Sequence, residues 1–329
     1  MHMLRRTWDG LGETHRGAAC ITAAVFLMAL ADALVKALGA DLPLWQIYLG
    51  RGLVAIPLLL ALGGRPGAAR TLPAGAWAWV ALRSLLLAVM WLLYYAALPQ
   101  LELATAAVCL YTAPLVIGLL SGLLLREPVP PRRWGALLLG FLGVLLALRP
   151  WQGPPDWRLL LPLLAALCYA LAMLLTRSRC REVPAATLAL ALNATLLLAG
   201  LAGGGLAGLA EVQAADWRFL LGAWAPLEGG TAGLLALLGL LLALYTLWVA
   251  RAYQWAPAAT VAAFDYAYLL FAALWGCLLF GERPAAPTWL GMAAVAAAGW
   301  LAVSRPGAPA ASPPGGRGSR RRWWRRPAR

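Results

Sequence analysis

Ionisable side chains inside strongly apolar runs are the residues of this sequence most able to do chemistry. The runs contain Asp32, Lys36, Arg51, Arg83 and Asp265. Placing such a charge at the centre of a bilayer costs about 3 kcal/mol or more, so each is a candidate for binding or moving a polar solute. Three positive and two negative charges leave a formal surplus of one positive charge. The set therefore favours an amino-acid-like, zwitterionic or anionic solute over a cationic drug.

Asp265 is the sharpest of these candidates because it lies deep in its run, between Phe264 and Tyr266. A carboxylate removed from water there can hold a proton in one state and release it in another. Asp265 is the first candidate for proton coupling and Asp32 the second. The alternative for Asp265 is a permanent ion pair with Arg51 or Arg83, and the sequence leaves both interpretations open.

The other ionisable candidates also have two interpretations each. Asp32 and Lys36 are four residues apart, so they lie on one face of a helix, either as a self-neutralising pair or as solute ligands. Arg51 and Arg83 lie too deep in their runs for easy snorkelling to the membrane surface. Each arginine either binds an anion or pairs with an aspartate.

Aromatic residues in the same runs provide a candidate wall for stacking and hydrogen bonding. Trp91 and Tyr94 share one run, and the adjacent Tyr95 cannot face a cavity at the same time as Tyr94. Tyr111 and Tyr266 lie deep in two further runs, at positions that correspond in an internal repeat. We therefore expect these two tyrosines to share a role near the axis that relates the two copies.

The composition predicts the elements that position these side chains. Of the 329 residues, 62% are hydrophobic and 12% are charged, against about 25% charged in soluble domains. Apolar runs of about 20 residues indicate membrane-spanning helices rather than barrel strands. We expect an all-α membrane protein with ten transmembrane helices, at residues 18–38, 44–62, 76–98, 104–125, 134–148, 159–175, 185–209, 232–250, 258–280 and 289–303.

An internal repeat divides these spans into two halves. A shift of 155 positions pairs Ala104 with Ala259, Tyr111 with Tyr266 and Trp134 with Trp289. Because each half has an odd number of spans, five, the second copy enters the membrane from the opposite side. We expect two inverted five-helix repeats, residues 18–149 and 157–304, between an N-terminal tail, 1–17, and a disordered basic tail, 307–329.

The net charge of +14 is interpreted as a topological signal. Arginines gather in alternate connecting segments and in the C-terminal tail, and the positive-inside rule then places both termini in the cytoplasm. We expect a multi-pass protein of the inner, or plasma, membrane whose partners are a small-molecule substrate and the lipid bilayer, with no nucleic acid. A homodimer is left open.

The run that begins at Leu103, LATAAVCLYTAPLVIGLLSGLLLREPVPPRR, is followed by WGALLLGFLGVLLALRP. With the weaker second copy, these segments resemble the EamA-type branch of the drug/metabolite transporter superfamily. The resemblance implies a cavity lined by the first four helices of each half, with the fifth and tenth helices peripheral. It also implies substrates among amino acids, nucleosides, vitamins, S-adenosylmethionine and drugs.

These observations predict a secondary transporter that works by alternating access, with proton coupling open. The alternatives are a drug or toxin exporter of the same fold, or a multi-span enzyme acting on a lipid-linked substrate. An enzyme is disfavoured because the histidines, His2 and His15, both lie in the N-terminal tail. We expect no cofactor and no metal, since no nucleotide-binding motif and no Cys-x-x-Cys occur.

Overall fold

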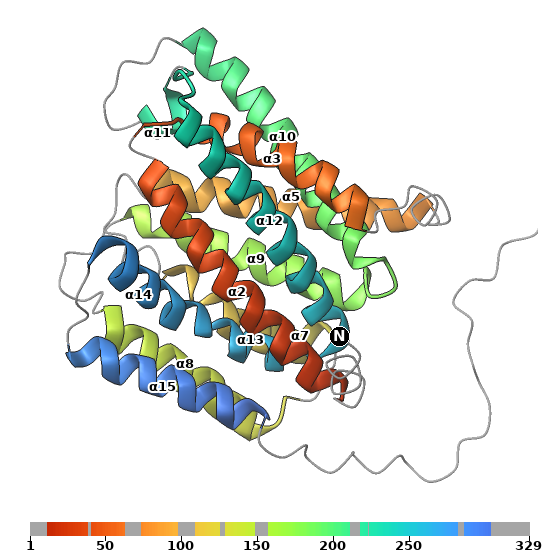
Figure 1. Ribbon diagram of the computed structural model, residues 1–329. Helices are drawn as coiled ribbons and strands as arrows, with labels where there is room; N and C mark the ends of the chain where they lie inside the picture. The colour runs from red at the N-terminus through yellow and green to blue at the C-terminus, as the bar shows by residue number, and fades with distance from the viewer. Residues whose placement is uncertain are drawn as a thin grey trace, which may run out of the picture.

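The computed structural model describes residues 12–38, 41–62, 74–97, 109–125, 129–148, 157–210, 218–222, 224–281 and 286–303. Every regular element within these ranges is a helix, and the long helices lie side by side in one bundle (Figure 1). Most of the two predicted tails, and the repeat residue Ala104, lie outside the described ranges.

The expected spans coincide with helices that the structure describes. They correspond in chain order to α2 (Glu13–Leu38), α3 (Leu44–Leu62), α5 (Ala74–Ala97), α7 (Ala113–Leu124), α8 (Pro131–Leu148), α9 (Leu160–Ser178), α10 (Ala185–Ala210), α12 (Gly229–Trp255), α13 (Ala258–Asp265) with α14 (Ala267–Phe280), and α15 (Ala286–Val303). Two short elements, η2 (Trp157–Leu159) and α11 (Arg218–Leu221), lie between spans. The expected ninth span is therefore two consecutive helices.

Within the described ranges, seven helical segments are long and apolar enough to cross a membrane by length and composition. They are α2, α3, α5, α9, α10, α12 and the combined run of α13 and α14. In such a setting the backbone polar groups must be satisfied within the segment, which an apolar helix does. The chain is thus a multi-pass helical membrane protein.

Proline and glycine mark several helix ends. Pro43 and Pro184 come directly before α3 and α10, and Pro257 precedes α13. At the other end of the same span, Gly281 stops α14 in a left-handed conformation with φ of 65°. Glycine adopts this conformation without the steric cost that a side chain adds.

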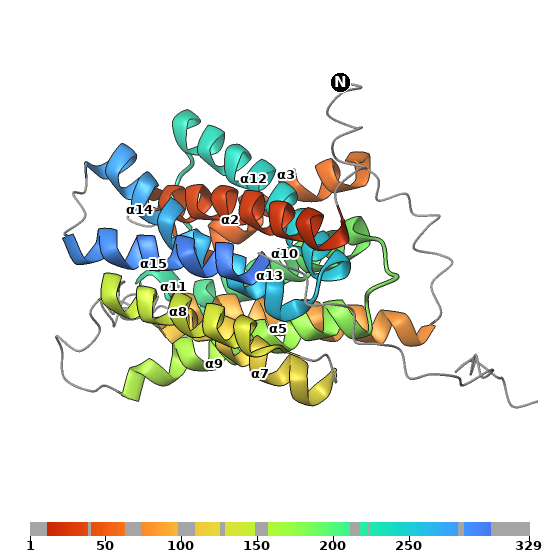
Figure 2. The ribbon, with the colours of Figure 1, turned by 90° about the horizontal axis from the view of Figure 1, so that it is seen from below.

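The helices divide into a main body and a peripheral pair. In the main body α2 contacts α12 and α14, α5 contacts α9, and α3 contacts α10. The helices α8 and α15 lie against each other at one edge (Figures 1 and 2). The ionisable and aromatic side chains that are candidates for binding a solute belong to the main body and not to this pair.

Glycines allow three close contacts that fix the register of these helices. A Cβ atom added to Gly239 of α12 would lie 2.6 Å from the backbone oxygen of Arg51 in α3. One added to Gly140 of α8 would clash with the Tyr266 ring, and one at Gly118 of α7 would clash with the end of the Leu137 side chain of α8. At Gly239 the neighbouring atom belongs to the backbone, so a side chain there would force α12 away from α3.

Candidate functional site

Two helix interruptions at corresponding places in the two halves define the centre of the molecule. In the second half α13 ends at Asp265 and α14 begins at Ala267, so Tyr266 stands in the break. In the first half Tyr111 and Thr112 form a turn directly before α7. The Thr112 hydroxyl donates to the Cys109 carbonyl at 2.7 Å. Interrupted helices expose backbone groups, which membrane proteins tolerate where they border a cavity.

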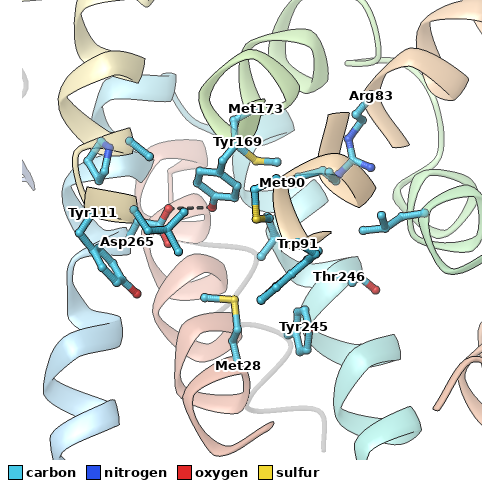
Figure 3. A pocket seen from close by; sticks show the side chains of 16 residues that line it. Met28, Arg83, Met90, Trp91, Tyr111, Tyr169, Met173, Tyr245, Thr246 and Asp265 are labelled. Carbon is cyan, nitrogen blue, oxygen red and sulfur yellow. Dashed lines mark hydrogen bonds between the residues drawn. The ribbon is translucent and has the colours of Figure 1, made fainter. Parts of the chain in front are cut away.

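A cavity of about 70 Å³ lies beside both interruptions (Figure 3). Its walls are mainly aromatic, methionine and aliphatic side chains, with a few polar groups. The lining residues are Met28, Arg83, Leu87, Met90, Trp91, Leu110, Tyr111, Ala113, Pro114, Tyr169, Met173, Leu192, Tyr245, Thr246, Val249 and Asp265. This combination of an apolar wall with sparse, oriented polar groups is typical of a small-molecule site.

Asp265 lies in this wall and accepts a hydrogen bond from the Tyr169 hydroxyl of α9 at 2.7 Å (Figure 3). The residue is buried, with 4% of its surface exposed. No ion pair within the described residues joins Asp265 to Arg51 or to Arg83. Of the two interpretations that the sequence left open, the ion pair is therefore absent from this conformation.

A second tyrosine–aspartate pair lies close by but outside the lining. The Tyr268 hydroxyl of α14 donates to Asp32 of α2 at 2.7 Å. The Tyr268 ring is stacked on Tyr111, with 5.2 Å between the ring centroids. The pair therefore connects a helix of the first half to a helix of the second. Lys36 also belongs to α2, but its side chain lies outside what the structure describes.

Arg83 and Arg51 are both buried and differ in their partners. The Nε atom of Arg83 donates to the Thr176 hydroxyl at 2.6 Å, and a longer contact of 3.4 Å joins its Nη1 atom to the Leu188 carbonyl. Arg51 stacks over the Tyr48 ring, 4.5 Å from its centroid, and its Nε and Nη2 atoms have no hydrogen-bond partner. Arg83 lines the cavity, and Arg51 does not.

The predicted aromatic residues also divide between the lining and the layer behind it. Trp91 and Tyr111 line the cavity, whereas Tyr94 and Tyr266 are buried outside the lining. The rings of Tyr111 and Tyr266 are stacked with centroids 6.4 Å apart, so these corresponding tyrosines do meet. Tyr266 stands against Gly140 of α8, which explains why it does not reach the cavity.

Sequence reasoning missed Tyr169, the partner of Asp265. No charge accompanies it in its apolar run, so nothing local distinguishes it from a packing residue. Aligning Pro43 with Pro184 would have placed Tyr169 opposite Met28, and both line the cavity. The remaining lining residues that it missed are apolar side chains, whose position depends on tertiary packing.

A bundle of apolar helices, two of them interrupted beside a cavity with polar and aromatic walls, defines a membrane protein built to hold a small solute. Comparison with known proteins agrees with this class. Residues 15–149 match the EamA-like transporter family. The EamA-type resemblance predicted from the sequence is therefore confirmed.

Two relatives carry the name riboflavin transporter. The chain is 34% identical over 205 residues to the one from Rhizobium johnstonii, in a match that covers 62% of this chain and 63% of that protein. It is 33% identical over 187 residues to the one from Vibrio cholerae serotype O1, covering 56% and 57% of the two. The chain thus matches less than two thirds of either relative. The family and both names are those of transporters, which confirms the expectation that the chain is not an enzyme.

A solved protein structure has the same arrangement of helices. Its TM-score with this chain is 0.67, and the superposition covers 87% of this chain and 97% of the other. The two sequences are 18% identical. This likeness extends to the fold and adds nothing about the solute.

Proposed function

We propose that this chain is a secondary transporter that carries a small aromatic metabolite, riboflavin in the first instance, across the inner membrane by alternating access. The observation that carries the proposal is the central cavity, where Trp91, Tyr111, Tyr169 and Tyr245 present aromatic surface beside a few polar groups. Flat conjugated rings bind well between such side chains. The names of the two relatives support the choice of riboflavin as the first solute to test.

A zwitterionic aromatic solute is the second candidate, and a specific observation favours it. Arg83 and Asp265 both line the cavity and lie on opposite sides of it in Figure 3. A carboxylate and an ammonium group on one solute would each meet an opposite charge there. This candidate keeps the solute class that the charges alone predict, and adds an aromatic ring to it.

The size of the cavity supports a cycle with more than one conformation. Sites for drug-sized ligands enclose about 300 Å³ or more, whereas this cavity encloses about 70 Å³. The side chains of Met28, Met90 and Met173 line it, and methionine adapts readily to a new shape. We propose that the solute enters after these helices separate, and that the cavity of the described conformation is contracted relative to the one that holds the solute.

The contacts between helices support the proposed inverted repeat. In the order of the spans, α2 corresponds to α9 and α5 corresponds to α12. Exchanging each helix for its counterpart therefore turns the contact of α2 with α12 into the contact of α9 with α5, and both contacts occur. Likewise α3 meets its own counterpart α10, and α8 meets its counterpart α15. Equivalent contacts in the two halves are what a pseudo-two-fold axis requires, and rocking about such an axis exposes the centre alternately to each side.

Proton coupling through Asp265 is part of the proposal, with Asp32 as the second carrier. Phenol groups of Tyr169, Tyr253 and Tyr111 interact with Asp265, so among the described residues its surroundings offer hydrogen bonds and no opposite charge. Replacing Asp265 by Asn keeps the size and removes the exchangeable proton. Uptake measured against external pH should then lose its pH dependence, and an Asp265→Asn profile identical to that of the wild type would remove Asp265 from this role.

Riboflavin uptake in a bacterial strain that can neither make nor import the vitamin tests the main proposal. The wild-type chain should restore growth at low riboflavin, and Trp91→Ala should raise the apparent KM several-fold by removing a stacking surface. Trp77→Ala is the matched control, because Trp77 is in the same helix and is exposed on the outside of the bundle. No riboflavin uptake by the wild type, with uptake of an aromatic amino acid, would favour the second candidate.

The proposed orientation has its own experiment. Reporter domains that are active only in the cytoplasm or only outside it, fused at each end of the chain, should place both termini inside. An external location of either terminus would contradict the arrangement inferred from the arginines.

A further inference from the structure

Arg51, Tyr48 and Tyr95 form a buried polar cluster outside the cavity lining. Their exposed fractions are 3%, 1% and 3%. The Nε and Nη2 atoms of Arg51 and the hydroxyl groups of both tyrosines have no hydrogen-bond partner. The cluster thus joins α3, which carries Arg51 and Tyr48, to the end of α5, which carries Tyr95.

Such a cluster is costly unless something binds to it. A buried cation loses its hydration, and each of its donors that finds no acceptor adds to the cost. Stacking on the Tyr48 ring at 4.5 Å returns only part of that loss. Asp32 interacts electrostatically with Arg51, but its carboxylate is bound to the Tyr268 hydroxyl. Tyr48, Tyr95 and Tyr245 also interact electrostatically with the guanidinium, and its Nε and Nη2 atoms remain available to an oxygen acceptor.

The other buried arginine of the described residues provides the contrast. Arg83 donates to the Thr176 hydroxyl and the Leu188 carbonyl, so its charge is held by fixed protein oxygens. Two donors of Arg83 therefore already have acceptors in this conformation. Arg51 instead presents free donors, and a planar guanidinium matches a planar pair of oxygens.

The cluster lies directly behind two walls of the cavity. The Tyr95 ring is stacked on Trp91, with centroids 5.3 Å apart and 20° between the planes. Tyr245, which lines the cavity from α12, interacts electrostatically with Arg51. Gly239 of α12 meets the backbone of Arg51, which fixes the position of the arginine relative to Tyr245. A movement of the Trp91 or Tyr245 side chain would open the cavity to Arg51.

We propose that Arg51, with Tyr48 and Tyr95, forms an acceptor subsite that binds the planar, oxygen-bearing edge of the transported solute when the cavity opens. This inference rests on the proposed function and adds to it the end of the solute that is recognised. The edge carries either a carbonyl group of the pyrimidine ring of a flavin, which accepts from one guanidinium donor, or a carboxylate on an aromatic solute, which accepts from two. Both present lone pairs in the plane of the guanidinium.

Binding to the purified full chain in detergent tests the subsite. The flavin probes are riboflavin and lumichrome, which share the ring and its carbonyl groups, whereas lumichrome lacks the sugar-alcohol chain. The carboxylate probes are indole-3-acetate and its uncharged amide. The variant is Arg51→Met, which keeps the length and loses the donors, and Arg251→Met removes the same charge from an exposed position of α12.

Arg51→Met should weaken the binding of both flavins by similar factors, about 10-fold or more, since hydrogen bonds to a charged group are lost. Its Tm should equal or exceed that of the wild type because a buried unpaired charge has been removed. Arg251→Met should change neither affinity. A different outcome is that the wild type binds no flavin but binds indole-3-acetate better than its amide, and that Arg51→Met loses this preference. In that case the subsite stands and riboflavin is the wrong solute.

Two results would overturn the subsite. The first is an Arg51→Met variant that binds riboflavin and indole-3-acetate as tightly as the wild type. The second is a fall in Tm together with wild-type affinity in the folded fraction, because that pattern belongs to an arginine that only supports the fold. A wild type that binds neither kind of probe would count against the subsite and the proposed function together.

Discussion

At the scale of single residues, the polar groups of this bundle are held mostly by neutral partners. Tyr169 holds Asp265, Tyr268 holds Asp32 and Thr176 holds Arg83. A hydroxyl group stabilises a buried charge without cancelling it. Each charge therefore stays able to attract a solute group of opposite sign or, in a carboxylate, to take up a proton.

Thr176→Val tests how strongly Arg83 depends on its hydroxyl partner. Valine has nearly the same shape, so the change removes the acceptor of Arg83 Nε and leaves the weaker 3.4 Å contact with Leu188. We expect a loss of about 1–3 kcal/mol in the free energy of unfolding, the cost of leaving a buried donor unsatisfied. Thermal unfolding in detergent measures it.

Thr195→Val is the control for this substitution. The Thr195 hydroxyl donates to the Ala191 carbonyl of its own helix, so no charged group depends on it. Its effect should stay below about 0.5 kcal/mol. Equal losses in the two variants would show that Arg83 gains nothing from Thr176.

The charges and the tyrosines show how far residue types alone can predict a site. Arg83, Trp91, Tyr111 and Asp265 were selected from the sequence, and all line the cavity. Their positions deep in apolar runs are a local signal. The pairing of Asp265 with Tyr169 has no local signal, because the two residues are 96 positions apart in the sequence. Only the packing of α9 against its neighbours brings the two together.

At the scale of elements, the two helix interruptions differ in how visible they are in the sequence. Pro114 stands in the first turn of α7, where it lacks a backbone donor that the helix does not need. It marks the first interruption. No proline or glycine accompanies the break at Tyr266, so the pattern predicts one continuous span there. At the break, the Tyr266 ring packs closely against Gly140 of α8, a contact between segments far apart in the sequence.

The close contact of α3 with α12 predicts that alanine substitutions at two glycines of α12 have opposite effects on stability. Gly239→Ala places a Cβ atom 2.6 Å from the Arg51 oxygen, so α12 must shift, at a cost of about 1–3 kcal/mol. Gly233→Ala meets no atom within 4 Å and should stabilise the helix by up to about 1 kcal/mol. Thermal unfolding of both variants decides this, and a Gly239→Ala protein as stable as Gly233→Ala would contradict the packing.

The same substitution at Gly239 carries information about Arg51. Because the glycine meets the backbone of that arginine, a displaced α12 also moves Tyr245 away from it. We expect Gly239→Ala to weaken the binding of riboflavin more than Gly233→Ala does. A change in stability without a change in affinity would mean that the spacing of α3 and α12 matters only to the fold.

At the scale of the whole molecule, the main body and the peripheral pair should behave differently during transport. The helices α2 and α14 contact each other next to Asp32 and Tyr268, close to the cavity. The helices α8 and α15 meet at one edge, and neither contributes a lining residue. If the solute passes between the halves, α2 must move relative to α14, whereas α8 and α15 can stay in contact.

Cross-linking tests this difference with two cysteine pairs in a background that lacks the native cysteines. Phe26→Cys with Phe271→Cys joins α2 to α14, since these rings are in contact with centroids 5.1 Å apart. Gly135→Cys with Leu301→Cys joins α8 to α15, where a Cβ atom at residue 135 would lie 3.9 Å from Leu301.

A short bifunctional thiol reagent of the disulfide-exchange type should stop uptake when it cross-links the first pair, and reductant should restore uptake. Cross-linking the second pair should leave uptake near its starting rate. Alternating access requires relative motion of elements around the central site. Undiminished uptake through a fully cross-linked α2–α14 pair would therefore exclude separation of these two helices as the step that admits the solute.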